Sequence, residues 1–138
     1  MKKLLIDTNI IIDLLAKREP FYNEAALLFT LADKNKIQLS VSSLTFANTN
    51  YILLQSKKPD EAKLILRKLK LIVQILSLDE KVVGLSLNDN DFKDFEDALQ
   101  YFSAIENEVD IIITRNLKDF QKAKLPVMTA AQFLKTIK

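Results

Sequence analysis

The sequence predicts an α/β fold in which a mostly parallel sheet is covered by helices on both faces. Short apolar segments alternate with helix-forming segments along the whole 138-residue chain, which is the element order of a parallel sheet with crossover helices. The segment VDIII at 109–113 is almost entirely apolar, as expected for a strand in the middle of such a sheet. A proline in LPV at 125–127 restricts that strand to an edge.

The amino-acid composition excludes several classes of functional site. There is no cysteine and no histidine, so disulfides, zinc fingers and Ser-His-Asp or Cys-His catalysis are all ruled out. A metal would have to be held by oxygen ligands, which favours Mg²⁺, Mn²⁺ or Ca²⁺. The single glycine, Gly84, rules out glycine-rich phosphate-binding loops. A net charge of +2 is too small to indicate nucleic-acid binding by itself.

The first strand is predicted at 4–6 and the first helix at 8–17, and KKLLIDTNIIIDLL at 2–15 covers the strand and most of the helix. Asp7 stands where the strand ends, at the carboxyl edge of the sheet, and open α/β sheets bind ligands at that edge. Asp, Thr and Asn are also good N-cap residues, so this stretch alone leaves open that it only begins a helix.

A second helix is predicted at 23–33, a second strand at 37–41 and a third helix at 42–56. The third helix has an apolar stripe at about 100° per residue. Its members are Leu44, Ala47, Tyr51 and Leu54. Asn48 lies on the same stripe, so its amide is either hydrogen-bonded locally in the core or part of a site.

The fourth helix is predicted at 60–70, with Asp60 as N-cap and Ala62, Ile65, Leu66 and Leu69 buried. Its opposite face carries three basic residues spaced i, i+4 and i+7. They are Lys63, Arg67 and Lys70. Such a face is usually only solvated, and the alternative is weak binding of an RNA backbone.

The next predicted elements are a strand at 71–76, a helix that Asp79 caps and a polar loop at 88–91. The helix that follows, at 94–107, is the most informative one. Its predicted apolar stripe is Ala98, Tyr101, Phe102 and Ile105. Asp94 and Asp97 fall on this stripe, whereas Glu96 is predicted to point to solvent. Acids at a helix N-terminus favour the dipole by ~0.3–1 kcal/mol each, which does not explain two of them on the inward face. Strands at 109–113 and 125–127 and a helix from Thr129 to 137 complete the chain.

Right-handed crossovers place the carboxyl ends of all parallel strands at one edge. Asp7 and the segment Thr114-Arg115-Asn116 follow two strands there, and the helices with Asn48 and with Asp94 and Asp97 begin there. Like charges at such close range repel unless a cation lies among them. A divalent ion at this edge could activate water for attack on a phosphodiester.

The residues of this edge resemble those of a PIN domain, and within that family those of VapC-type toxins of bacterial toxin–antitoxin pairs. The resemblance runs nearly end to end and rests on LLIDTNIIIDLL, VSSLTFAN and DFEDALQYFSAIENEVDIIITRNLKDF. It implies one domain, 1–138, with a three-layer α/β/α fold around a central, mostly parallel sheet. It also implies Mg²⁺- or Mn²⁺-dependent cleavage of RNA, a cognate antitoxin protein as partner, and a homodimer.

The same resemblance implies roles for individual residues. The catalytic residues would be Asp7 and Asp97, with Asp94 as an auxiliary acid, and the metal ligands Asp7, Asp97 and Asn116. Supporting positions would be Thr8, Asn9, Asn48, Thr114 and Asp119. Asn48 stands where most members have Glu, and Asn116 where many have Asp. These departures leave a rival open, a catalytically degenerate PIN domain that acts as an RNA- or protein-binding module. A phosphatase is a third reading, but the chain lacks the nucleophile motif.

The N-terminus does not predict export or membrane insertion. Met1-Lys2-Lys3 resembles the start of a signal peptide, but Asp7 and Asp13 interrupt the apolar run that follows and no small-residue cleavage site is present. No uncharged run approaches the ~20 residues that span a bilayer. The sequence therefore predicts a cytoplasmic protein without a membrane contact.

Overall fold

A computed structural model describes residues 1–137 and contains one five-stranded sheet with the strand order β3-β2-β1-β4-β5. All four strand pairs are parallel. The strands are β1 (Lys2–Ile6), β2 (Ile37–Ser42), β3 (Val73–Leu76), β4 (Ile111–Ile113) and β5 (Val127–Met128). The prediction of a parallel sheet is confirmed, with residues 111–113 of VDIII inside the sheet. The edge strand begins at Val127, directly after Pro126, so the predicted strand at 125–127 is shifted.

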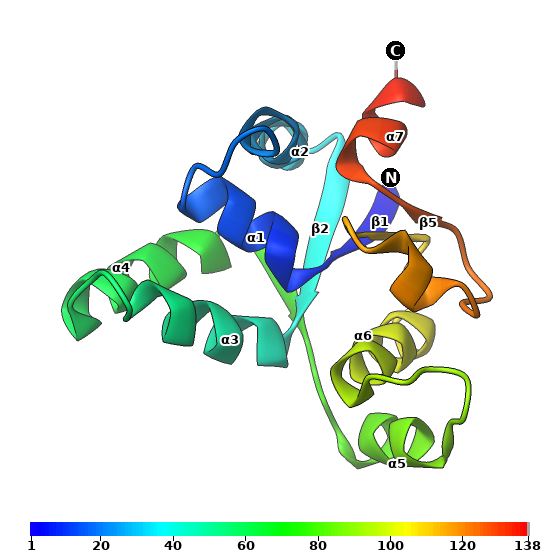
Figure 1. The fold of residues 1–138 in the computed structure, drawn as a ribbon. Helices are drawn as coiled ribbons and strands as arrows, with labels where there is room; N and C mark the ends of the chain where they lie inside the picture. The colour runs from blue at the N-terminus through cyan, green and yellow to red at the C-terminus, as the bar shows by residue number, and fades with distance from the viewer. Residues whose placement is uncertain (138) are drawn as a thin grey trace.

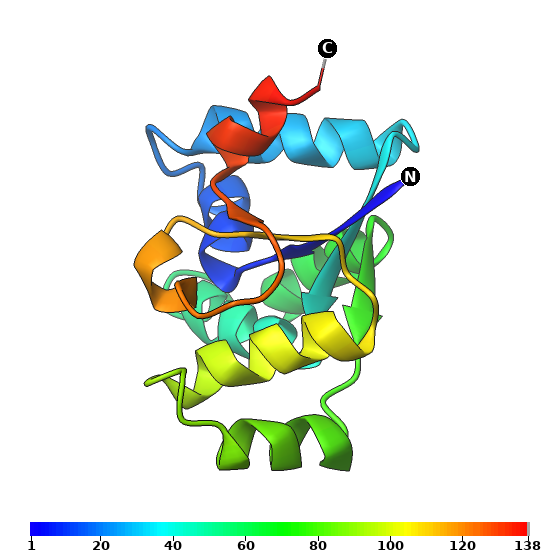
Figure 2. The same ribbon diagram turned by 90° about the vertical axis from the view of Figure 1, so that its right-hand side faces the viewer.

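Helices cover both faces of this sheet and complete the three-layer α/β/α fold (Figures 1 and 2). The helices are α1 (Thr8–Leu15), α2 (Tyr22–Asp33), α3 (Ser43–Leu53), α4 (Pro59–Lys70), α5 (Glu80–Asn88), α6 (Phe95–Glu106) and α7 (Ala130–Lys135), with a short 3₁₀ helix, η1 (Leu117–Phe120). No helix within residues 1–137 has both the length and the apolar character needed to cross a bilayer.

Two hydrophobic clusters hold the layers together, because neighbouring residues of a strand point to opposite faces. In β1, Leu4 and Ile6 join the cluster beneath α1, α2 and α7, whereas Leu5 joins the cluster beneath α6. In β4, Ile112 lies on the α6 side and its two neighbours on the other. The buried residues of β1 and β4 are therefore apolar on both faces of the sheet, and Asp7 and Thr114 follow directly where these two strands end.

The buried face of α3 differs from the prediction. Thr45, Thr49 and Leu53 are buried, whereas Tyr51 is 71% exposed and Leu54 is 42% exposed. The hydroxyl groups of Thr45 and of Thr8 on α1 lie 3.0 Å apart. Small β-branched side chains let α3 pack closely against α1, so the helix turns its larger apolar residues outward. The predicted stripe of Leu44, Ala47, Tyr51 and Leu54 is therefore wrong as a core face.

Several element boundaries also differ. Pro59 begins α4 and Lys58 is its N-cap, so Asp60 lies inside the helix and does not cap it. Residues 71 and 72 form a turn, and β3 begins only at Val73. In α6, Ile105 is 40% exposed, because this helix packs between the sheet and α5 and its buried arc runs through Ala98, Tyr101 and Ala104.

Candidate functional site

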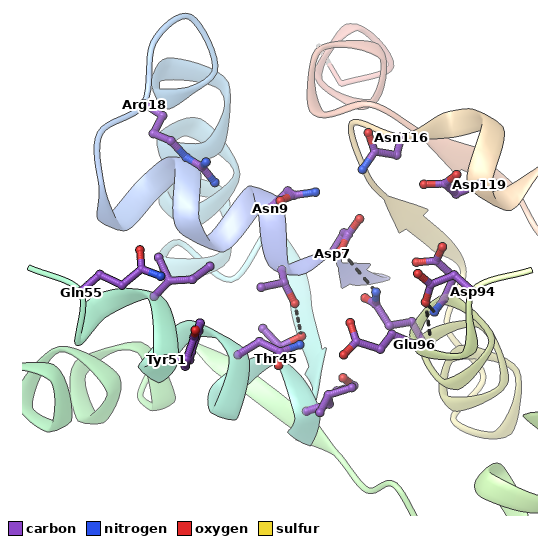
Figure 3. Close-up of a pocket in the computed structure, with 17 residues that line it drawn as sticks. Asp7, Asn9, Arg18, Thr45, Tyr51, Gln55, Asp94, Glu96, Asn116 and Asp119 are labelled. Atoms are coloured by element: carbon purple, nitrogen blue, oxygen red, sulfur yellow. Dashed lines mark hydrogen bonds between the residues drawn. The ribbon is translucent and has the colours of Figure 1, made fainter.

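A cleft of about 650 Å³ lies at the carboxyl edge of the sheet, beside the ends of β1, β2 and β4 (Figure 3). It contains all of the acids, amides and supporting residues predicted from the sequence except Thr114, which lies beneath it. These residues are Asp7, Thr8, Asn9, Asn48, Asp94, Asp97, Asn116 and Asp119. Lys63, Arg67 and Lys70 are exposed on α4 and do not line this cleft. The structure thus brings together the predicted acidic residues and leaves the basic face elsewhere.

Asp7 is the most firmly held carboxylate of the cleft. It follows β1, is 7% exposed, and its main-chain N–H donates to the carbonyl of Ile113 at 2.9 Å. The Thr114 hydroxyl donates to Oδ2 at 2.7 Å, and the Gln100 amide donates to Oδ1 at 3.3 Å. An ionised carboxylate has about four acceptor sites, so both oxygens keep lone pairs for a cation.

Asp97, in the first turn of α6, is the carboxylate whose charge is most disfavoured. Burial raises the pKa of Asp97 to about 7, and the negative charges of Asp94, Asp119, Asp7 and Glu96 add to the rise. The charged groups that shift this pKa are all negative, so they disfavour the charged form of Asp97. A bound divalent ion would supply a compensating positive charge.

Asp94 has a structural role that the sequence left open. It is the N-cap of α6, and its Oδ1 accepts hydrogen bonds from the main-chain N–H groups of Glu96 at 2.8 Å and Asp97 at 3.3 Å. Its other oxygen makes neither of these bonds. The N-cap preference of Asp therefore accounts for its presence, and its auxiliary catalytic role stays a prediction.

Glu96 does not turn away from the site as predicted. It is exposed, but it lines the cleft beside Asp94 (Figure 3). Because α6 points its N-terminal end at the cleft, side chains from more than one side of the first turn reach the mouth. The two residues point in different directions from the helix, so Asp97 is half-buried and Glu96 is exposed, but both line the cleft.

The two amides that stand at expected acid positions both line the cleft. Asn48 is half-buried on α3, near the Thr8–Thr45 contact. Asn116 is exposed before η1, and its main-chain N–H donates to the Thr114 hydroxyl at 3.0 Å. Thr114 therefore links this segment to Asp7. Amide oxygens are acceptable ligands for hard cations, although they bring no charge.

Sequence reasoning missed several residues of the cleft, among them Gln100, Arg18 and Tyr51. Gln100 is buried and contacts Asp7 directly. It lies one helical turn after Asp97, so the i, i+3 spacing on α6 could have found it. Arg18 and Tyr51 also line the cleft. Arg18 follows a helix end and Tyr51 belongs to an apparent core stripe, so neither carries a local signal.

The acids of the cleft do not form a closed cage for a metal. Within residues 1–137, no three acidic side chains gather closely enough to enclose an ion. Mg²⁺ is usually held by one or two carboxylates, with waters and substrate phosphates completing its shell. Asp7 and Asp97, with amide oxygens nearby, fit that open kind of site and do not fit a site made of protein ligands alone.

Known proteins with similar sequences and structures have this architecture. Residues 3–118 match a family described as PIN domain. The chain is 30% identical over 139 residues to "Ribonuclease VapC1" of Aquifex aeolicus strain VF5, covering 96% of this chain and 93% of the relative. A toxin-antitoxin complex from Klebsiella pneumoniae has a chain that is 23% identical, with a TM-score of 0.71 and coverage of 92% and 97%. FitAcB from Neisseria gonorrhoeae has a chain that is 18% identical, with a TM-score of 0.70 and coverage of 93% and 98%.

Proposed function

The chain belongs to the PIN domain family, and on that basis we propose that it is a Mg²⁺- or Mn²⁺-dependent endoribonuclease. The observation that carries the proposal is the pairing of Asp7 and Asp97 in one cleft. Asp7 is oriented by two hydrogen bonds, and the pKa of Asp97 is raised by burial and by its acidic neighbours. The similarity to a ribonuclease over nearly the whole chain supports RNA as substrate.

In this proposal each residue of the cleft has a defined task. Asp7 and Asp97 would hold the divalent ion, with the amide oxygen of Asn116 as a further ligand. When bound, the ion supplies Lewis-acid chemistry for in-line attack on a phosphodiester. Thr114 and Gln100 fix the Asp7 carboxylate, and Thr8 anchors the start of α1 to Thr45.

The remaining predicted positions have lesser tasks. Asn9, Asp94 and Asp119 would shape the polar walls around the scissile phosphate. The basic face of α4, with Lys63, Arg67 and Lys70, would attract RNA only through its charge, from outside the cleft.

We further propose that the protein is the toxin of a type II toxin–antitoxin pair, acting in the cytoplasm. The proposal draws on the relative named as a VapC ribonuclease and on the solved toxin–antitoxin complexes that share the fold. Its partners would be a small cognate antitoxin protein and a second copy of the chain. Light scattering after gel filtration tests the homodimer, because a monomer mass at micromolar concentration contradicts it.

Asn48 favours a rival function and makes a direct test necessary. It lines the cleft at the position where the family resemblance expects Glu, so the chain could be a degenerate domain that binds RNA or protein without cleavage. Induced expression in a bacterial host separates the two functions. An active toxin arrests growth, and RNA from the arrested cells carries new 5′ ends. A degenerate module leaves the cellular RNA intact.

A further inference from the structure

A carboxylate outside the acidic cluster is completely buried in α1. Asp13 is 0% exposed, and its two oxygens pair with two arginines. Oδ1 lies 3.2 Å from Nε of Arg18, and Oδ2 lies 3.0 Å from Nε of Arg115. Burial raises the pKa of Asp13, and the charges of Arg115 and Arg18 oppose that rise. A buried charge is tolerated only with such partners, so Asp13 fixes both arginines in place.

The two arginines face different surroundings. Arg115 stacks on the ring of Phe21, with its guanidinium carbon 4.1 Å from the ring centroid, and it does not line the acidic cleft. Arg18 lines the cleft, and its side chain is 42% exposed. The main-chain N–H of Arg18 also donates to the carbonyl of Asp13 at 3.0 Å. Both the backbone and the side chain of Arg18 are therefore held by one residue.

Arg18 retains binding capacity on the side of the cleft. A guanidinium has five N–H groups, and the contact with Asp13 is made through Nε. The two Nη groups can form a bidentate contact with phosphate. Because Asp13 already orders the side chain, a ligand would not have to offset its full loss of rotamer freedom.

The position of Arg18 within the cleft separates it from the acids. In the described part of the chain, Arg18 is the only positively charged residue that lines the cleft. Figure 3 shows it on the side of Gln55 and Tyr51, whereas Asp94, Glu96 and Asp119 lie on the opposite side. An anion on Arg18 therefore lies away from the place where a metal would join Asp7 and Asp97.

We propose that Arg18, positioned by Asp13, binds a backbone phosphate next to the one that is cleaved. The inference rests on the proposed function, because it assigns the neighbouring nucleotide of the same RNA substrate. Tyr51, which is 71% exposed and lines the same cleft, favours a nucleotide over a free anion, since aromatic side chains stack on bases of single strands. Arg18 touches substrate, and Asp13 is a positioning residue that acts through it.

A contact with a non-reacting phosphate has a characteristic kinetic effect. The contact is made equally in the ground state and in the transition state, so its loss raises KM and leaves kcat nearly unchanged. Arg18→Gln should show this pattern. Arg18→Lys keeps the charge and loses the planar fork, so its KM should lie between those of the parent and Arg18→Gln.

Binding of a short, mixed-sequence, fluorescein-labelled single-stranded RNA in EDTA measures the contact without cleavage. Arg18→Gln should weaken binding by about tenfold or more, as for loss of one charge-assisted contact. It should also flatten the slope of log affinity against log salt by about 0.7. Lys17→Gln is the matched control, because it removes the same charge one residue earlier from an exposed side chain outside the cleft.

The role of Asp13 is tested through its coupling to Arg18. Asp13→Asn should weaken RNA binding, and adding it to Arg18→Gln should cause no further loss. If Asp13→Asn does not fold, the RNA affinities of Arg18→Gln and Arg18→Lys still test the contact itself, and Arg115→Gln serves as the structural control. That variant removes the other ion pair, so it should lower the melting temperature while leaving the RNA affinity unchanged.

Three results would overturn the inference. They are unchanged RNA affinity and salt slope in Arg18→Gln, an equal loss of affinity in Lys17→Gln or Arg115→Gln, and a fall in kcat at constant KM. If the parent protein cleaves RNA and Arg18→Gln matches it in every measurement, the role of Arg18 is overturned and the proposed function is not. A parent protein that neither binds nor cleaves RNA overturns the proposed function as well.

Discussion

The hydroxyl of Thr114 donates a hydrogen bond of 2.7 Å to Oδ2 of Asp7, joining the residues that follow β4 and β1. The bond orients the carboxylate that we assign as a metal ligand, and loss of such an outer partner commonly costs about 10–100-fold in metal affinity. Thr114→Val preserves the shape of this fully buried side chain and removes the donor. We expect Mn²⁺ affinity, measured by calorimetry, to fall within that range. Unchanged affinity would show that the bond serves only the fold.

Asp97 and Glu96 are neighbours in sequence with different burial, which makes them a matched pair. Asp97→Ala should reduce Mn²⁺ affinity by at least about tenfold, because it removes a proposed ligand. Glu96→Ala removes an exposed charge at the mouth and should have a much smaller effect. Calorimetric titration of both variants compares them directly, and equal losses would place the metal elsewhere.

The raised pKa of Asp97 predicts how stability depends on pH without metal. Because the pKa of about 7 in the folded protein lies above the ordinary value of 3.8, the folded state binds this proton more tightly than the unfolded state. Its stabilising effect is complete below about pH 4 and is lost as the pH rises through about 7. In EDTA, the melting temperature of Asp97→Asn should therefore decline less than that of the parent over this range. Parallel curves would contradict the assigned pKa shift.

The metal should show the opposite dependence on pH. The ion competes with the Asp97 proton, so the apparent Mn²⁺ affinity of the parent should rise as the pH increases through about 7. Calorimetry at a series of pH values measures this rise. An affinity that stays constant across this range would separate Asp97 from the metal.

Asn48→Glu restores the acid that the family resemblance expects. At an effective dielectric of about 20, a carboxylate ~4 Å from a cation gains roughly 4 kcal/mol per unit charge before desolvation. Without metal, repulsion from Asp7 and Asp97 should lower the melting temperature. With Mn²⁺ the upward shift should exceed that of the parent, and cleavage should equal or exceed the parent's. An exposed charge change is usually within about ±0.5 kcal/mol in either direction, so equal metal-induced shifts would place residue 48 outside the site.

The sequence predicted the cleft because of a rule about topology. Parallel strands end at one edge, so Asp7 and Thr114 could be placed together although 107 positions separate them. The inward position of Asp97 followed from helical spacing. The first argument uses only the common direction of parallel strands, and the second uses only the residue spacing of a helix. Both can be read from short stretches of sequence.

The rest depends on contacts that local patterns do not encode. The predicted orientation of α3 was wrong because Thr45 contacts Thr8 on α1. The small threonines of α3 pack against α1 in place of the predicted apolar stripe. Asp13 looked like an isolated acid within an apolar run, and its partners lie in the following loop and after β4. Contacts between distant segments determined these features. The spacing of apolar residues within one segment does not show which distant residue that segment contacts.

RNA cleavage across a Mn²⁺ titration, by the parent and by Asp7→Asn, tests whether the protein cleaves RNA through a metal held by Asp7. The substitution keeps the size of the side chain and removes the charge that attracts the metal, so the melting temperature in EDTA should stay close to that of the parent. We predict cleavage by the parent with Mn²⁺ and none in EDTA, and a loss of at least about 100-fold in Asp7→Asn at every Mn²⁺ concentration. A folded Asp7→Asn variant that cleaves as fast as the parent, or a parent that cleaves equally well in EDTA, would contradict metal-dependent cleavage through Asp7.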